Sequence, residues 1–181
     1  CGIIRVTDVE DLIDTAAAFL SQPVPRGNRV GIVANGGGWA VLTADACTKA
    51  GLDVTPLPEE TLQRLDRRLP AWWNRQNPVD MVAGMSRGAF FKAIEIVAQC
   101  DQVDAVIALG FGYGAANVAA IASAPDGDTP EYNSYIKATL HSDLRGARFI
   151  LDTIASYRKP VLLTSEYIVG ADRDNNEAIL E

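Results

Sequence analysis

Two glycine-rich turns contain the residues of this sequence that are best suited to binding chemistry. The first is Asn35-Gly36-Gly37-Gly38, followed by Trp39, between an apolar β-branched run and a stretch with helical spacing. Glycines let backbone N–H groups approach an anion closely, and the start of a helix adds partial positive charge. The turn lacks the Gly-Lys-Ser/Thr of a Walker A loop and the full spacing of a dinucleotide fingerprint. We predict a phosphate site, with a ligand-free strand-to-helix turn as the alternative.

The second turn is Gly110-Phe111-Gly112-Tyr113-Gly114, which follows a continuous apolar run. It combines backbone donors with two aromatic rings and suits a small-molecule pocket or, alternatively, a flexible crossover. Asn77 and Asp80 flank the start of another extended segment, where the carboxylate either orients a ligand or stabilises a turn. Ligands collect at the carboxyl ends of strands in an open α/β sheet, so we expect these residues near one edge.

The sequence does not favour nucleophilic or metal chemistry. His141 is the one histidine, and its neighbours include no obvious group that would orient it as a base. Cys47 lies among alanines in a predicted helix, where a buried and inert thiol is expected. The three cysteines have no CxxC spacing, which argues against both a disulfide framework and a zinc cluster. We therefore expect no metal site and no covalently bound cofactor.

Length and composition predict a single globular domain over residues 1–181. Apolar residues make up 48% and charged residues 22% of the chain, as in ordinary soluble proteins. The net charge of -7 disfavours nucleic acid and anionic membranes as partners. The cysteines show no disulfide framework, so a reducing, cytoplasmic location is expected. The sequence also shows no signal peptide and no membrane-spanning run. The chain opens at Cys1 instead of Met, which predicts a piece cut from a longer multidomain protein.

Strands alternate with helices along the chain, which predicts parallel βαβ units in three layers, with helices on both faces of the sheet. We expect about five strands in the flavodoxin-like order 2-1-3-4-5, with the Rossmann order as the alternative. A capping box at Thr7 and Glu10 predicts the first helix, and turn residues predict a loop over 123–134. The expected strands are 29–34, 53–54, 78–82, 103–109 and 159–164, and the expected helices are 8–20, 39–49, 59–69, 87–99, one ending near Tyr157, and 171–181.

These motifs, taken together and in order, resemble the NDP-forming acyl-CoA synthetases, which include ADP-forming acetate-CoA ligase and succinyl-CoA synthetase. The resemblance covers nearly the whole chain. The matching segments are Gly2-Ile3-Ile4-Arg5-Val6, Arg29 to Gly38, Ala44-Asp45, Lys49-Ala50-Gly51-Leu52, Asn77-Pro78-Val79-Asp80 and Val103-Asp104-Ala105-Val106.

The resemblance implies a flavodoxin-like ligase domain that corresponds to the C-terminal domain of the succinyl-CoA synthetase β subunit. The family reaction interconverts acid, CoA and NTP with acyl-CoA, NDP and phosphate, through an acyl phosphate and a phosphohistidine. By resemblance, Asn35 to Gly38 open a helix that points at the phosphohistidine, and Gly110 to Gly114 lie near the acid substrate. CoA, ATP or ADP and Mg are expected on a CoA-binding domain and an ATP-grasp domain of an oligomeric parent enzyme.

The sequence also departs from the family pattern. The family's phosphohistidine lies just upstream of the stretch that matches Gly2, and His141 does not match it. Trp39-Ala40 replaces a common Pro-Gly, and residues 112–157 are longer than the usual connection. We expect a domain that is inactive alone. The alternatives are a non-catalytic regulatory or scaffold module of a fused acyltransferase, and a flavin-binding flavodoxin.

Overall fold

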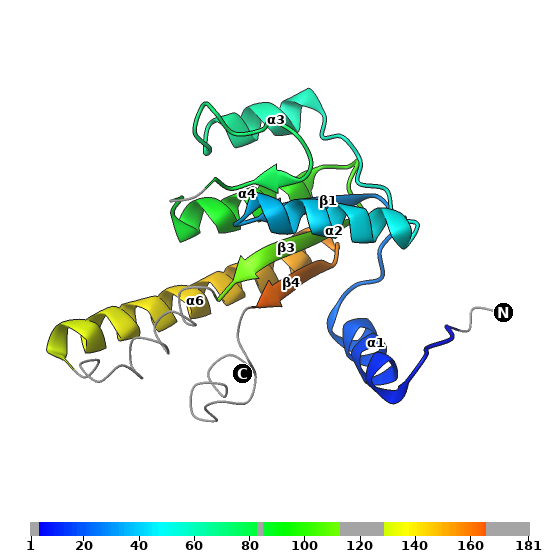
Figure 1. Ribbon diagram of the computed structural model, residues 1–181, viewed down its shortest axis with the longest axis horizontal. Helices are drawn as coiled ribbons and strands as arrows, with labels where there is room; N and C mark the ends of the chain where they lie inside the picture. Colours follow the sequence, from blue (N-terminus) through cyan, green and yellow to red (C-terminus); the bar gives the residue numbers. More distant parts are fainter. Residues whose placement is uncertain (1–3, 83–84, 113–128, 166–181) are drawn as a thin grey trace.

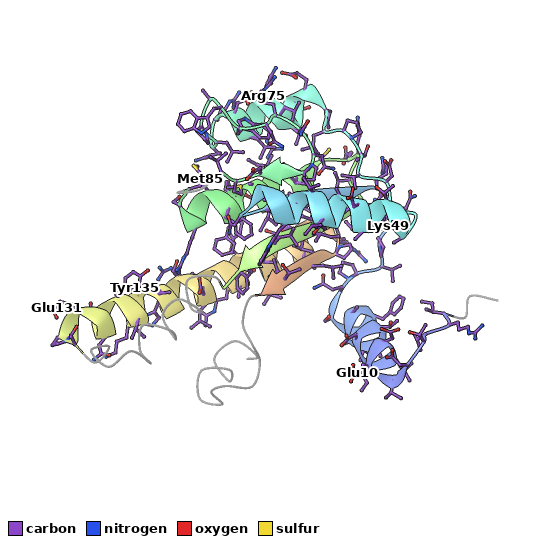
Figure 2. All side chains as sticks on the ribbon, in the orientation of Figure 1. Glu10, Lys49, Arg75, Met85, Glu131 and Tyr135 are labelled. Atoms are coloured by element: carbon purple, nitrogen blue, oxygen red, sulfur yellow. The ribbon has the colours of Figure 1, made fainter. Side chains whose placement is uncertain are left out.

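The computed structural model describes residues 4–82, 85–112 and 129–165 of the chain. Tyr113, Gly114 and the expected helix over 171–181 lie outside the described residues. Figure 1 shows a sheet with helices on both of its faces, and Figure 2 adds the side chains to the same view. The expected three-layer α/β architecture with a parallel sheet is confirmed.

The described sheet has four strands in the order β2-β1-β3-β4. All neighbours are parallel, with Val33 of β1 opposite Val79 of β2, and Val106 of β3 opposite Val161 of β4. The third neighbouring pair joins β1 to β3 along the whole of β1. This is the flavodoxin-like order and not the Rossmann order, since β3 adds beside β1. The bounds are β1 Val30–Ala34, β2 Val79–Asp80, β3 Ala105–Phe111 and β4 Val161–Ser165.

The expected fifth strand is not present in the described sheet. The segment over 53–54 forms only an isolated parallel bridge between Asp53 and Arg29. Asp53 O accepts from Val30 N at 2.7 Å, so this segment shares the outer edge of β1 with β2. The prediction of a second strand at 53–54 was therefore wrong. One bridging residue and the prolines at 56 and 58 leave too little backbone for a ladder.

Buried side chains fall into two clusters, one on each face of the sheet. On one face, Ile32 and Ala34 pack with Ala40 and Cys47 of α2. On the other, α3, α4 and α6 cover residues that include Val33. Successive strand residues point to opposite faces, so β1 is buried on both sides, as its apolar run predicted. The helices are α1 Val9–Ser21, α2 Gly37–Lys49, α3 Glu59–Asp66, α4 Arg87–Gln99 and α6 Pro130–Tyr157.

Three helix starts differ from the sequence prediction. Helix α2 begins at Gly37, two residues before the expected start at 39. Asp8, not Thr7, caps α1, because its carboxylate accepts from Asp11 N at 2.8 Å. The predicted loop over 123–134 was wrong from residue 130 onward, where α6 begins. Thr129 followed by Pro130 is a helix-start signal that the abundant turn residues concealed. No helix of the described residues is long and apolar enough to span a membrane.

Candidate functional site

The first glycine turn joins β1 to α2 at the carboxyl end of the sheet. β1 ends at Ala34, Gly36 is the N-cap of α2, and the helix begins at Gly37. No side chain caps this helix, and Ala40 N donates to Gly36 O as its first hydrogen bond. The backbone N–H groups at the start of α2 are thus left for an external acceptor, as anion binding at a helix end requires.

The three glycines have different surroundings. A Cβ on Gly36 or Gly38 would meet no atom within 4 Å, so the space beside both residues is open. A Cβ on Gly37 would lie 2.7 Å from Asp80 Oδ2, so only glycine fits there without displacing the carboxylate. The φ of Gly36 is -174°, which is ordinary extended backbone. Close approach, and not a left-handed backbone, is what requires a glycine in this turn.

The second glycine turn lies directly beside the first. Asn35 N donates to Leu109 O at 3.1 Å, and Asn35 Nδ2 donates to Gly110 O at 3.2 Å. Gly110 has a φ of +93°, and a Cβ on it would come within 2.9 Å of Asn35 Cβ. Glycine at 110 is therefore required twice, by its left-handed backbone and by the nearness of Asn35. The structure brings together two turns that are 75 residues apart in sequence.

The second turn also differs from the prediction in where its strand ends. Gly110 and Phe111 belong to β3, with a register shift between Leu109 and Phe111 where it pairs with β4. The Phe111 side chain is 8% exposed and packs edge-on against Phe91 of α4, with ring centroids 6.1 Å apart. Its ring is part of the core. Gly112 follows with a φ of +75°, and Tyr113 and Gly114 lie outside the described residues.

Asp80, the last residue of β2, lies beside the first glycine turn. Its Oδ1 accepts from Val82 N at 3.0 Å, while Met81 N donates to Ala34 O at 2.9 Å and ties the ends of β2 and β1 together. Its Oδ2 faces Gly37. Asp80 thus stabilises its own turn, which is one of the two roles considered from the sequence. It also places negative charge beside the start of α2.

The expectation that Asn77 lies at this edge was wrong, because Asn77 precedes β2 and contacts the start of β1, at the opposite end of the strands from the glycine turns. Its Nδ2 donates to Val30 O and Thr55 O, each at 2.8 Å, and its Oδ1 accepts from Ile32 N at 2.9 Å. The amide extends the ladder along the edge of β1, where the short β2 leaves backbone groups unpaired. This bridging role was not predicted, although an Asn before a short strand was a visible signal.

The remaining sequence-predicted residues occupy separate places. Trp39 is the third residue of α2 and is 46% exposed. His141 is an exposed residue of α6. Cys47 is buried, and burial raises the pKa of its thiol, which keeps it protonated and unreactive. Across residues 4–82, 85–112 and 129–165, no group of three or more His, Cys, Asp or Glu residues could hold a metal ion.

This edge of the sheet can bind and orient an anion. It offers free backbone N–H groups, the positive end of a 13-residue helix and open space beside Gly36 and Gly38. Asn35 and Asp80 supply the neighbouring polar side chains, neither of which is paired with a nucleophile in the contacts described above. The arrangement suits a supporting role toward a group that another segment presents.

Comparison with known proteins identifies the family of this chain. A model of the Ligase-CoA domain matches residues 30–123. The chain is 37% identical over 108 residues to the alpha subunit of ADP-forming acetate–CoA ligase II of Pyrococcus furiosus, covering 60% of this chain and 23% of the relative. It is 34% identical over 108 residues to the ADP-forming 4-hydroxybutyrate–CoA ligase of Nitrosopumilus maritimus, covering 60% of this chain and 15% of the relative.

Solved structures share the fold over almost all of the chain. A protein of Pyrococcus horikoshii OT3 matches 98% of this chain and 35% of its own, with 28% identity and a TM-score of 0.67. The dinucleotide-forming acetyl-coenzyme A synthetase 1 of Candidatus Korarchaeum cryptofilum, solved with phosphate and ADP, matches 99% of this chain and 33% of its own. Its TM-score is 0.68 at 22% identity, which supports the fold alone.

The extent of these matches establishes the family. The chain spans about a quarter or less of the two curated relatives and about a third of each solved chain. The family model covers more than half of the 181 residues, including β1, α2, β2 and most of the edge described above. This chain therefore belongs to the Ligase-CoA domain family.

Proposed function

We propose that this chain is one domain of an NDP-forming acyl-CoA synthetase and that the turn Asn35 to Trp39 helps to hold the phosphoryl group of a phosphohistidine. The observation that carries the proposal is the uncapped start of α2, at the edge where the ends of β1, β2 and β3 meet. Membership of the Ligase-CoA family supports it. The relatives named as ADP-forming CoA ligases give the reaction class.

The chemical role of this chain is electrostatic support. A phosphoryl group is an anion, and fixed N–H dipoles at a helix start stabilise it without rearrangement. Gly36 and Gly38 leave room for that group to approach the backbone. Asn35 opens the first turn, and its hydrogen bonds to Leu109 O and Gly110 O fix the backbone there. The domain binds and orients, and it does not complete the reaction alone.

Asp80 has a further part in this proposal. Its carboxylate beside Gly37 repels a free anion and favours a group that also offers an N–H, such as the imidazole of a phosphohistidine. Asn77 supports the site from a distance, because it anchors the segment that leads to Asp80. We assign the second turn, Gly110 to Gly114, to the side of the small carboxylic acid substrate.

The other parts of the reaction belong to the rest of the enzyme. We propose that CoA-binding and ATP-grasp domains, fused or in a partner subunit of an oligomeric cytoplasmic enzyme, bind CoA, ATP or ADP and Mg. Those groups supply the thiol, the transferable phosphate and its charge neutralisation. The described residues of this chain would contribute no metal-binding cluster to them. The low share of each relative that the chain covers supports this division.

The test is a charge placed at Gly38 in the complete ligase. Gly38→Glu adds a carboxylate in open space beside the proposed phosphoryl group, so repulsion should slow phosphate transfer by about tenfold or more. Gly38→Gln is the matched control, with the same shape and no charge. An acid in the first turn favours a helix, so the melting temperature should not fall. Transfer from labelled ATP to the enzyme's histidine is the measurement.

One outcome would contradict this role of the turn. If Gly38→Glu and Gly38→Gln transfer phosphate at the rate of the unchanged enzyme, the turn does not face the phosphoryl group. A parent protein that contains the ligase domains but forms no phosphoenzyme would instead support a non-catalytic regulatory or scaffold module.

A further inference from the structure

Helix α1 presents an apolar face that is left exposed among the described residues. No residue of α1 is buried there. Five large apolar side chains are between 52% and 90% exposed. They follow helical spacing and lie on one side of the helix. We call them the α1 surface: Val9, Leu12, Ile13, Phe19 and Leu20.

The position of α1 leaves this surface open. Figure 1 shows the helix standing apart from the layers around the sheet, joined to them by the segment over 22–28. A hydrogen bond anchors the end of the helix, since Val161 N of β4 donates to Gln22 Oε1 at 3.1 Å. An isolated helix of 13 residues is marginal in water, so α1 needs packing against a partner to be stable.

We propose that the α1 surface docks in an apolar groove, rimmed by Lys and Arg side chains, on another domain of the same ligase. This inference rests on the proposed function, in which the chain is one domain of a larger enzyme. Four acidic residues and no basic residue lie between positions 8 and 22, so a basic rim is the complementary partner. They are Asp8, Glu10, Asp11 and Asp14.

Charge also disfavours a second copy of the chain and a membrane as binding partners of the α1 surface. In a dimer of this chain, two identical acidic helices and two chains of net charge -7 would face each other, and their repulsion disfavours that contact. Membrane-surface helices instead have Lys and Arg on the polar face, which attract anionic lipids. Relatives several times as long as this chain provide the additional polypeptide that the proposed partner domain requires.

Hydrogen exchange at the backbone amides of residues 9–21 tests the proposal. We would compare chain 1–181 alone with the complete ligase, using α4 as the internal reference because its core face is buried. Exchange in α1 should be at least about tenfold slower in the complete ligase, as for a helix whose apolar face is covered. Equal rates in the two proteins would overturn the proposal.

A variant pair separates docking from folding. Leu20→Glu changes the most exposed side chain of the α1 surface and should restore fast exchange in the ligase without lowering the melting temperature of chain 1–181. Leu151→Glu is the matched control, since Leu151 is 63% exposed on α6, and it should leave protection unchanged. If Leu20→Glu unfolds the chain, Leu12→Glu takes its place. Retained protection in the substituted, folded ligase contradicts docking through this surface.

The alternative occupants have their own outcomes. Protection of α1 that rises with the concentration of chain 1–181 alone would identify a second copy and overturn the proposal. Protection by vesicles of phosphatidylcholine and phosphatidylglycerol would identify a membrane and overturn it too. Hydrogen exchange is measured without phosphate transfer, so the two experiments are independent. Equal exchange rates in α1 would overturn the docking proposal and leave the proposed phosphate site untouched. Normal phosphate transfer by Gly38→Glu would overturn the proposed phosphate site and leave the docking of α1 to be judged by exchange.

Discussion

At the scale of single residues, Asn77 shows how one side chain supports a site that it does not touch. Its amide donates to Val30 O and Thr55 O and accepts from Ile32 N, so all three bonds go to backbone groups. β2 has only two residues and pairs with Val33 and Ala34. The amide continues the pairing where β2 does not reach. It thereby holds the chain that leads to Asp80 against β1.

We predict that Asn77→Asp destabilises the protein although it preserves the shape of the side chain. The substitution replaces a donor to two carbonyl oxygens with an acceptor, which should lower the free energy of unfolding by about 2 kcal/mol or more. Chemical denaturation measures it. Asn28→Asp is the control, because the Asn28 amide makes an exposed hydrogen bond to Gly51 O and should cost under about 1 kcal/mol. Equal losses would contradict the bridging role.

At the scale of elements, the contact between α4 and α6 depends on Gly146. A Cβ on this glycine would lie 2.0 Å from Cζ of Phe91 and 2.4 Å from its Cε2. The Phe91 ring is itself surrounded, with ring contacts to Phe90, Phe111 and Phe149. Helix propensity alone favours alanine at position 146, yet close packing of the two helices requires glycine.

We predict that Gly146→Ala lowers the free energy of unfolding by about 1–3 kcal/mol, because the added methyl group would force the Phe91 ring out of its contacts with the neighbouring Phe rings. Thermal and urea unfolding measure it. Gly88→Ala is the control in α4, where the nearest atom is Ser86 Oγ at 4.0 Å, and it should be neutral or stabilising. Adding Phe91→Ala should remove the penalty of Gly146→Ala in a double-mutant cycle. Additive losses would show that the ring and the glycine do not conflict.

At the scale of the whole molecule, an ion pair joins the amino-terminal ends of the two central strands. Asp104 is buried before β3 and accepts from Arg29 Nε and Nη2, each at 2.8 Å, and from Arg29 N at 3.1 Å. The hydrogen bonds from the Arg29 side chain are the main cause that lowers the pKa of Asp104. The pair lies at the opposite end of the strands from the glycine turns.

This pairing makes stability depend on pH. The folded pKa of Asp104 lies below its unfolded value of about 3.9, so its contribution is present above that pH and is lost as pH falls through the folded pKa. We predict that Asp104→Asn is less stable than the unchanged chain at pH 7 and that the difference shrinks below about pH 4. Urea unfolding across pH measures it, with the exposed Asp45→Asn as control. A difference independent of pH would contradict this.

Local features of the sequence were enough to predict the architecture. Apolar runs and turn residues located β1, β3, β4 and most helices, since these signals act over a few neighbouring residues. Prediction failed where one residue type serves two purposes. Pro and Thr near residue 130 form turns as readily as they start helices, and the segment over 53–54 is too short for periodicity to distinguish a strand from a bridge.

The sequence by itself determined that two glycine-rich turns follow strands, that the chain is acidic, and that its first helix is amphipathic. Only the tertiary structure decided that Gly37 faces Asp80, that Gly110 faces Asn35, and that the apolar face of α1 is left open. The reason is physical. Strand order brings together residues as far as 75 positions apart, and local periodicity contains no information about which face meets which neighbour.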